Sequence, residues 1–340
     1  MRHAALRLAL AFVVATVGCS SGSQTQTTFS GSTMGTTYNV TIVGDAASVA
    51  PRVQEVLDSV NDSMSTYKAT SELSRFNQAT AADWFPVSPE LATVVAEALR
   101  IAEITHGAFD PTVGPLVDAW GFGPIKTDAP PDVATLDAAR ALVDYRLVAV
   151  DTERNALRKK EDGVRLDLSA IAKGFAVDQI HDMLRANGYR NFLIEVGGEV
   201  RAAGTSGSGR AWRIGIDAPS PGPRTAGGHQ VAISIADQAV ATSGDYRNFR
   251  IVDGTRLSHT IDPRSGRPIA HALASVTVVA KTCMLADAVA TAVNVLGPEQ
   301  GWGLLKNRFT ECTGYIILHD KGDRFVEKME RRFEKMLLKP

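Results

Sequence analysis

Apolar residues recur at intervals of three and four along five stretches of the chain, a spacing typical of amphipathic helices. The predicted helices span residues 53–63, 89–106, 136–142, 170–187 and 284–296. The fourth has the clearest signals at its ends, because Ser169 is suited to cap its first turn and Gly188 its last.

Short apolar runs bounded by turn residues lie between these helices and predict β-hairpins. Run 192–196 meets run 200–203 across Gly197-Gly198, and run 250–252 meets run 256–261 across Asp253-Gly254. Further pairs are 143–150 with the run from 157 onward, and 315–318 with 325–326. Hairpins place neighbouring strands antiparallel, and there is no internal repeat. We therefore expect an α+β fold with largely antiparallel sheets, built as one domain of two lobes over residues 29–340.

The first residues resemble an export signal. Arg2, His3 and Arg7 precede an apolar run over 8–17, which is too short for a permanent membrane span. The sequence ATVGC around Cys19 is similar to a bacterial lipobox. We predict a lipoprotein signal peptide over 1–18, lipidation of Cys19 and a polar tether to residue 28. The protein would then sit at the periplasmic face of a bacterial membrane, with the inner membrane as first expectation. A buried N-terminal helix is the alternative.

The amino-acid composition excludes few classes of protein. Of 340 residues, 44% are hydrophobic and 21% charged, as in soluble globular proteins. With 36 basic and 37 acidic residues there is no positive excess to attract nucleic acid, so we expect no such partner. Cys283 and Cys312 show no metal-ligand spacing. They could pair in an oxidising compartment, but two buried free thiols are favoured.

Two places carry residues suited to binding a metal or phosphate. Asp287 and Thr291 lie four apart on a predicted helix, so their oxygens face one side, and Mg²⁺ accepts such ligands. An acid near a helix start can instead merely complement the helix dipole. Asp167 ends a predicted strand just before the helix that contains Lys173. Free amides there and a lysine suit a phosphate, although an ordinary helix cap explains the same residues.

Other polar motifs are less specific. His259 precedes a Pro-Gly turn and could act as an acid or base, a phosphate partner or a surface residue. The Gly-rich stretches 204–209 and 221–228 are expected to be surface loops, and the first lacks the Lys-Ser/Thr of a nucleotide P-loop.

The order of the motifs is more specific than any one of them. From about Phe29 to the last predicted strand, the chain resembles the ApbE family of FAD:protein FMN transferases. The matching motifs are GSTMGTTY (31–38), MSTY (64–67), SELSRFN (71–77), GAFDPTVGPL (107–116), WGFG (120–123), DLSAIAKG (167–174), VGGE (196–199), ATSGDY (241–246), SHTIDPRSGRP (258–268) and the segment 286–297.

This resemblance implies an ApbE-type, T-fold-like architecture with FAD in a cleft between the two lobes. The residues that it implies around FAD are Met34, Tyr67, Ala108, Phe109, Asp110, Asp167, Lys173 and Ile261. The backbone carbonyl of Ala170, Asp287 and Thr291 are expected to hold Mg²⁺. The chain departs from some members of the family at Ala290, where they have Asp, and at Lys173, where others carry Glu.

The implied activity is Mg²⁺-dependent transfer of FMN from FAD to a Thr or Ser of another protein, with AMP released. His259 is the first candidate for a catalytic base and Asp287 the second. Expected acceptors are exported flavoprotein subunits of respiratory or electron-transfer complexes that carry a Ser/Thr motif. The alternatives are a periplasmic FAD pyrophosphatase and a non-catalytic FAD-binding lipoprotein.

Overall fold

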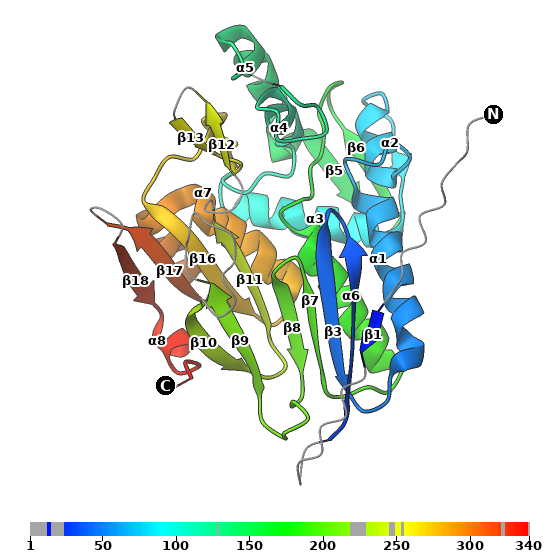
Figure 1. Ribbon diagram of the computed structural model, residues 1–340. Coiled ribbons are helices and arrows are strands. Elements are labelled where there is room, and N and C mark those ends of the chain that lie inside the picture. The colour runs from blue at the N-terminus through cyan, green and yellow to red at the C-terminus, as the bar shows by residue number, and fades with distance from the viewer. Residues whose placement is uncertain are drawn as a thin grey trace, which may run out of the picture.

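A nine-stranded sheet forms the centre of the computed structural model, which describes residues 12–14, 24–127, 129–217, 229–244, 249–252, 255–320 and 324–338. In spatial order the strands are β1 (Phe12–Val14), β2 (Gln26–Thr33), β3 (Thr36–Val43), β7 (Phe192–Val196), β8 (Glu199–Ala203), β11 (Ala239–Gly244), β16 (Leu273–Ala280), β17 (Thr313–His319) and β18 (Phe325–Met329). Every neighbouring pair is antiparallel, which confirms the expected α+β class (Figure 1).

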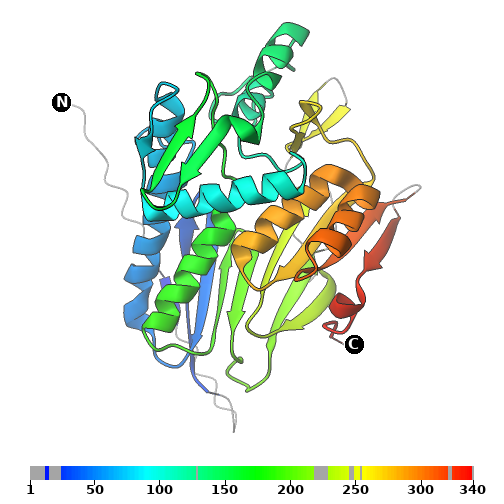
Figure 2. The same cartoon turned by 180° about the vertical axis from the view of Figure 1, so that it is seen from behind.

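Three helices cover one face of this sheet, as Figure 2 shows: α1 (Ala50–Met64), α6 (Ala172–Ala186) and α7 (Cys283–Arg308). On the opposite face, the hairpin of β9 (Trp212–Asp217) and β10 (His229–Ile235) covers the middle strands, and α8 (Arg331–Glu334) packs beside it. Because β16 is covered on both faces, all eight of its residues are buried.

A long segment is inserted between the adjacent strands β3 and β7. It begins with the 3₁₀ turn η1 (Ala47–Val49) and α1, and continues through α2 (Glu72–Gln78), α3 (Pro89–Ile104), α4 (Gly114–Ala119), α5 (Val133–Arg140) and a second 3₁₀ turn, η2 (Tyr145–Leu147). The segment also contains a small antiparallel sheet in the order β4 (Phe85–Pro86), β6 (Ala156–Lys159), β5 (Val148–Asp151), and it ends with α6.

Two small hairpins lie near α4 and α5 (Figure 1): β12 (Phe249–Val252) with β13 (Thr255–Ser258), and β14 (Ile261–Asp262) with β15 (Arg267–Pro268). A separate apolar cluster that includes Trp120 and Ile261 joins the second hairpin to α4. The indole Nε1 of Trp120 also donates to the carbonyl of Gly266 at 2.8 Å. These contacts fix the loop that precedes Ile261 above the main sheet.

The ends of α6 test the local predictions. Its C-terminus is as predicted: Gly188 has φ of 86°, its N–H bonds the Arg185 carbonyl, and the Tyr189 N–H bonds the Leu184 carbonyl. The prediction that Ser169 caps the N-terminus is wrong. The helix begins at Ala172, and the Ser169 N–H instead donates to Asp167 Oδ1 at 2.8 Å in a tight turn.

The start of helix α7 is not capped by the residue that precedes it in the sequence. The Thr282 side chain makes no capping bond, and the carboxylate of Asp178 on α6 accepts the first two N–H groups, from Cys283 at 2.8 Å and Met284 at 2.9 Å. The helix is broken at Gly297, where φ is 77°. In the described part of the chain, neither α7 nor any other helix combines the length and apolarity that a membrane crossing requires.

Cys283 and Cys312 are both buried and unpaired, which confirms the expected free thiols. Of the predicted signal peptide 1–18, residues 12–14 form β1, and the rest lies outside the described residues together with the lipidation site Cys19 and the Gly-rich stretch 221–228. Residues 24–28 of the predicted tether are described, and β2 already begins within them at Gln26. The other Gly-rich stretch, 204–209, connects β8 to β9 as expected.

Candidate active site

A cleft of about 1040 Å³ opens between the main sheet and the inserted segment. Its walls come from parts of the chain far apart in sequence: the β2–β3 turn, the loops around 109 and 168, the β7–β8 turn, β9, β11, the loop 259–263 and α7. The sequence-predicted residues that line it are Met34, Tyr67, Ala108, Phe109, Asp110, Asp167, Ala170, Lys173, His259, Ile261, Asp287 and Thr291. Every predicted site residue in the described part of the chain thus lies in one cleft.

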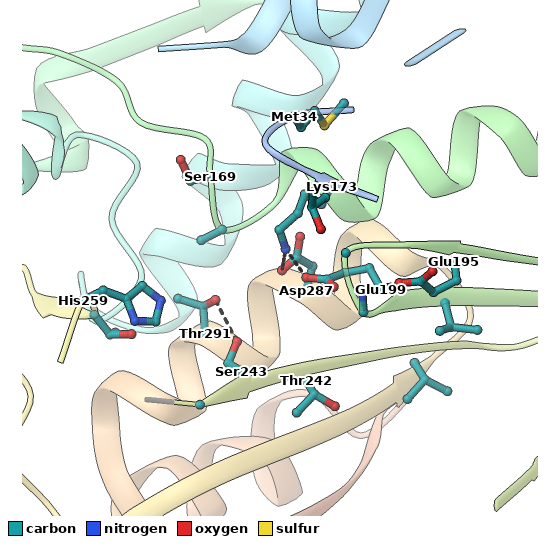
Figure 3. A pocket seen from close by; sticks show the side chains of 18 of the residues that line it. Met34, Ser169, Lys173, Glu195, Glu199, Thr242, Ser243, His259, Asp287 and Thr291 are labelled. Carbon is teal, nitrogen blue, oxygen red and sulfur yellow. Dashed lines mark hydrogen bonds and ion pairs between the residues drawn. The ribbon is translucent and has the colours of Figure 1, made fainter. Parts of the chain in front are cut away.

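Helix α7 contributes the polar base of the cleft. Asp287 is buried, and its Oδ2 accepts the Gly174 N–H of α6 at 3.1 Å. This close approach of the two helices depends on Gly174, because a Cβ there would lie 2.4 Å from the Cys283 carbonyl oxygen. Thr291, one turn further along, lies 3.2 Å from the hydroxyl of Ser243 on β11 (Figure 3).

Lys173 lies between two carboxylates. Its Nζ forms an ion pair with Glu199 on β8 and lies 3.9 Å from Oδ1 of Asp287 (Figure 3). Burial alone would lower the pKa of Lys173, but the carboxylates of Asp287 and Glu199 outweigh it and raise that pKa. Burial raises the pKa of Glu199, and the positive charge of Lys173 opposes that shift. The lysine therefore stays cationic at neutral pH, with fixed partners.

The inserted segment supplies the opposite wall. Ala108 and Phe109 are buried beside Asp110. The Asp110 carboxylate is already engaged, since Oδ1 accepts the Thr112 N–H at 2.8 Å and Oδ2 accepts the Tyr145 N–H at 2.9 Å. Burial raises the pKa of Asp110, and the Thr112 hydrogen bonds oppose that shift. A ligand that donates a hydrogen bond to Asp110 must therefore share carboxylate oxygens that already accept backbone N–H groups of this wall.

The rim is more exposed. Tyr67 is 65% exposed, with its hydroxyl donating to the Phe122 carbonyl at 3.2 Å, so its ring is available to a planar ligand. Met34 has φ of 47° and, with Gly35 at 73°, forms a two-residue hairpin turn that points into the cleft. His259 lines the cleft on the side of Thr291 (Figure 3).

Several cleft residues were not singled out from the sequence. Glu199 was part of a matched motif without a role, and Ser243 lies in another such motif. Strand β7, the β7–β8 turn and strand β9 add Glu195, Gly197, Gly198 and Arg213. The sequence did contain one indication of a role for Glu199: this carboxylate directly follows the Gly197-Gly198 turn.

Residues 34–316 match the ApbE family over most of the chain. The chain belongs to the ApbE family. An FAD:protein FMN transferase of Vibrio cholerae serotype O1 is 44% identical over 338 residues, covering 98% of both chains. This confirms the resemblance found in the motifs.

Solved ApbE structures have the same fold. The flavin transferase ApbE from Vibrio cholerae matches with a TM-score of 0.83 and 42% identity, over 92% of this chain and 99% of that one. The apo form of the Pseudomonas stutzeri flavinyl transferase ApbE matches with a TM-score of 0.83 and 36% identity, over 94% and 98%.

The fit of the expected Mg²⁺ can be tested on the donors present. Within the described ranges, no three His, Cys, Asp or Glu side chains gather as a metal cluster. The expected set instead contains one carboxylate, Asp287, with the hydroxyl of Thr291 and a carbonyl of Ala170, all lining the cleft. Hard oxygen donors of mixed type suit Mg²⁺, which keeps several waters and binds through few carboxylates. The residues fit the ion.

Proposed function

We propose that this protein is a Mg²⁺-dependent FAD:protein FMN transferase that joins FMN through a phosphoester to a Thr or Ser of an acceptor protein. The observation that carries the proposal is the convergence of twelve predicted residues, distant in sequence, on one cleft. The transferase names of the Vibrio cholerae relatives support the same reaction.

The reaction is a displacement at phosphorus. The acceptor hydroxyl attacks the phosphorus on the FMN side of the FAD diphosphate, a new P–O bond forms, and the phosphoanhydride P–O bond breaks. AMP leaves with the bridging oxygen, and the hydroxyl proton passes to a base. His259 lines the cleft near Thr291 and is the first candidate for that base, with Asp287 the second.

Lys173 lines the cleft together with Asp287 and Thr291, where it could contact a diphosphate. Lys173 is a cation with little freedom of movement, because Glu199 and Asp287 hold it. A fixed charge stabilises developing phosphate charge without first having to reorganise. When bound by Asp287, Thr291 and the Ala170 carbonyl, Mg²⁺ would neutralise charge on the diphosphate.

The proposal extends to location and partners. We infer that a lipid on Cys19 tethers the protein to the periplasmic face of a bacterial membrane. Its acceptors would be exported flavoprotein subunits of respiratory or electron-transfer complexes. Confining enzyme and acceptor to one surface raises their effective concentration.

The test is to incubate the enzyme with FAD, Mg²⁺ and an acceptor domain that carries a Ser/Thr flavinylation motif, and to measure the intact mass of the acceptor. The expected products are an FMN phosphoester on the acceptor and an equal amount of AMP. Free FMN with an unmodified acceptor would instead identify a hydrolase, and unchanged FAD a binding protein. His259→Ala should bind FAD normally and transfer FMN slowly. His319→Ala, at the end of β17, is the matched control.

A further inference from the structure

Part of the main sheet lies uncovered next to the reaction centre. On β3 and β7, the side chains facing the three helices, such as Tyr38 and Ile194, are buried. The alternate side chains Asn39, Leu193 and Glu195 are exposed or half-buried and line the cleft on the opposite face of these strands. The cleft thus continues along these two strands as a groove, and its floor contains the half-buried Leu193, which also packs against the apolar cluster beneath β9.

Strand β9 forms a side of this groove. Trp212 and Ile216 fix it to the sheet beneath, and residues from Arg213 to Asp217 line the cleft. One edge of β9 pairs with β10, and none of the strands in the described ranges pairs with the other edge. An unpaired edge presents a row of backbone N–H and C=O groups that can accept another strand.

The groove and the reaction centre are one continuous space. The lining of the cleft runs from Asp287 and Thr291 past Glu199 to Leu193 and β9. Its volume of about 1040 Å³ lies at the upper limit of roughly 300–1,000 Å³ for small-molecule sites. A transferase must hold two substrates at once, so the cleft needs room for a polypeptide as well as for FAD.

We propose that an extended segment of the acceptor protein lies in this groove and pairs, as an added strand, with the edge of β9 that lies opposite β10. The inference rests on the proposed function. Backbone pairing supplies affinity that depends little on sequence, and alternate side chains of the segment meet the groove floor. One of them contacts Leu193, beside the polar pair in which Asn39 donates to Glu195 at 2.7 Å. The strand leads the acceptor hydroxyl toward the centre near Asp287.

The first test uses full-length enzyme, FAD, Mg²⁺ and the membrane fraction of a strain of the source organism that lacks this enzyme. Covalent flavin is measured as fluorescence of protein bands in a denaturing gel. Leu193→Asp places a second carboxylate beside Glu195 in the groove floor. Thr28→Asp is the control for a new carboxylate on this sheet face, because the exposed Thr28 lies two strands away, through the pairs Thr28–Thr41 and Thr41–Leu193.

We expect Leu193→Asp to label acceptors at least tenfold more slowly while its FAD dissociation constant changes less than twofold, and Thr28→Asp to match the wild type. Labelling by Leu193→Asp at the wild-type rate would overturn the groove as the acceptor site. A parallel loss of FAD binding would also overturn it, because Leu193 would then belong to the FAD site. If the wild type itself labels nothing and releases FMN, the proposed function fails and this inference falls with it.

The second test addresses the strand pairing itself. The labelled peptide is identified by mass spectrometry, and synthetic copies carry a single N-methyl group at successive positions. Each N-methyl group removes one backbone donor, so transfer should fall at alternate positions, the period of a strand. Losses without a period of two, or a parent peptide that is neither labelled nor inhibitory, would contradict strand addition.

Discussion

Replacing Asp178 should loosen the helix that carries the reaction centre. Asp178 is buried on α6 and supplies the only side-chain cap that the described residues give to the start of α7. Its Oδ1 also pairs with Nη1 of Arg201 at 2.7 Å. Asp178→Ala leaves two helix N–H groups without acceptors and a largely buried guanidinium without its partner.

The size of the loss follows from these contacts. Hydrogen bonds to a charged group contribute about 1.5–3 kcal/mol each, and breaking a buried ion pair costs about 3–5 kcal/mol. One carboxylate makes all three contacts, so the contributions overlap, and we expect Asp178→Ala to lower the free energy of unfolding by about 4–6 kcal/mol. Asp178→Asn keeps a single acceptor oxygen and should lose about 2–3 kcal/mol.

Urea denaturation followed by circular dichroism measures both variants. The control is Asp182→Ala: Asp182 lies 4.0 Å from the same Arg201 nitrogen but is 67% exposed. An exposed pair of this kind is worth less than about 1 kcal/mol. A loss below about 1 kcal/mol for Asp178→Ala, or an equal loss for the control, would refute the assignment of Asp178 as the cap of α7.

Two other predictions concern pH and metal. Burial lowers the pKa of His181, so the folded state disfavours the protonated ring. The stability that this group contributes is therefore present above its unfolded pKa of about 6.5 and is lost as the pH falls through the lower folded value. The urea midpoints at pH 5 and pH 7.5 should differ more for the wild type than for His181→Gln. Equal differences would show that His181 does not cause the loss of stability at low pH. Thr291→Val should raise the Mg²⁺ concentration for half-maximal AMP release about tenfold or more, with Thr291→Ser restoring it. An unchanged Mg²⁺ requirement would remove Thr291 from the metal site.

Local rules predicted much of the fold. The β7–β8 and β12–β13 hairpins form where Gly-Gly and Asp-Gly separate apolar runs, because these dipeptides favour tight turns. The end of α6 at Gly188 follows from the backbone freedom of glycine. The predicted start of α6 was wrong because the Asp167 carboxylate accepts the Ser169 N–H in a tight turn, and the helix begins only after this turn.

Long-range features could not be predicted in this way. Nothing local indicates that β3 pairs with β7, and no spacing rule indicates that Asp178 caps α7. Glu199 was missed because its importance comes from burial against Lys173, which tertiary packing alone creates. All the residues that were predicted from the order of the motifs line the cleft. The order of the motifs identifies the family and therefore the complete fold, whereas the spacing of residues within one helix indicates only which of them share a face.

The insertion of residues 44–191 between two adjacent strands affects when the enzyme can become active. The edge of β3 can pair only after β7, which lies about 150 residues later in the chain, has been synthesised. The base of the cleft lies on α7, which is still closer to the C-terminus. Such non-local contacts slow folding, because the intervening chain must be ordered first. A chain that is only partly synthesised lacks the contacts that hold the two walls of the cleft together. FAD chemistry should therefore begin only once nearly the entire polypeptide has been made and folded.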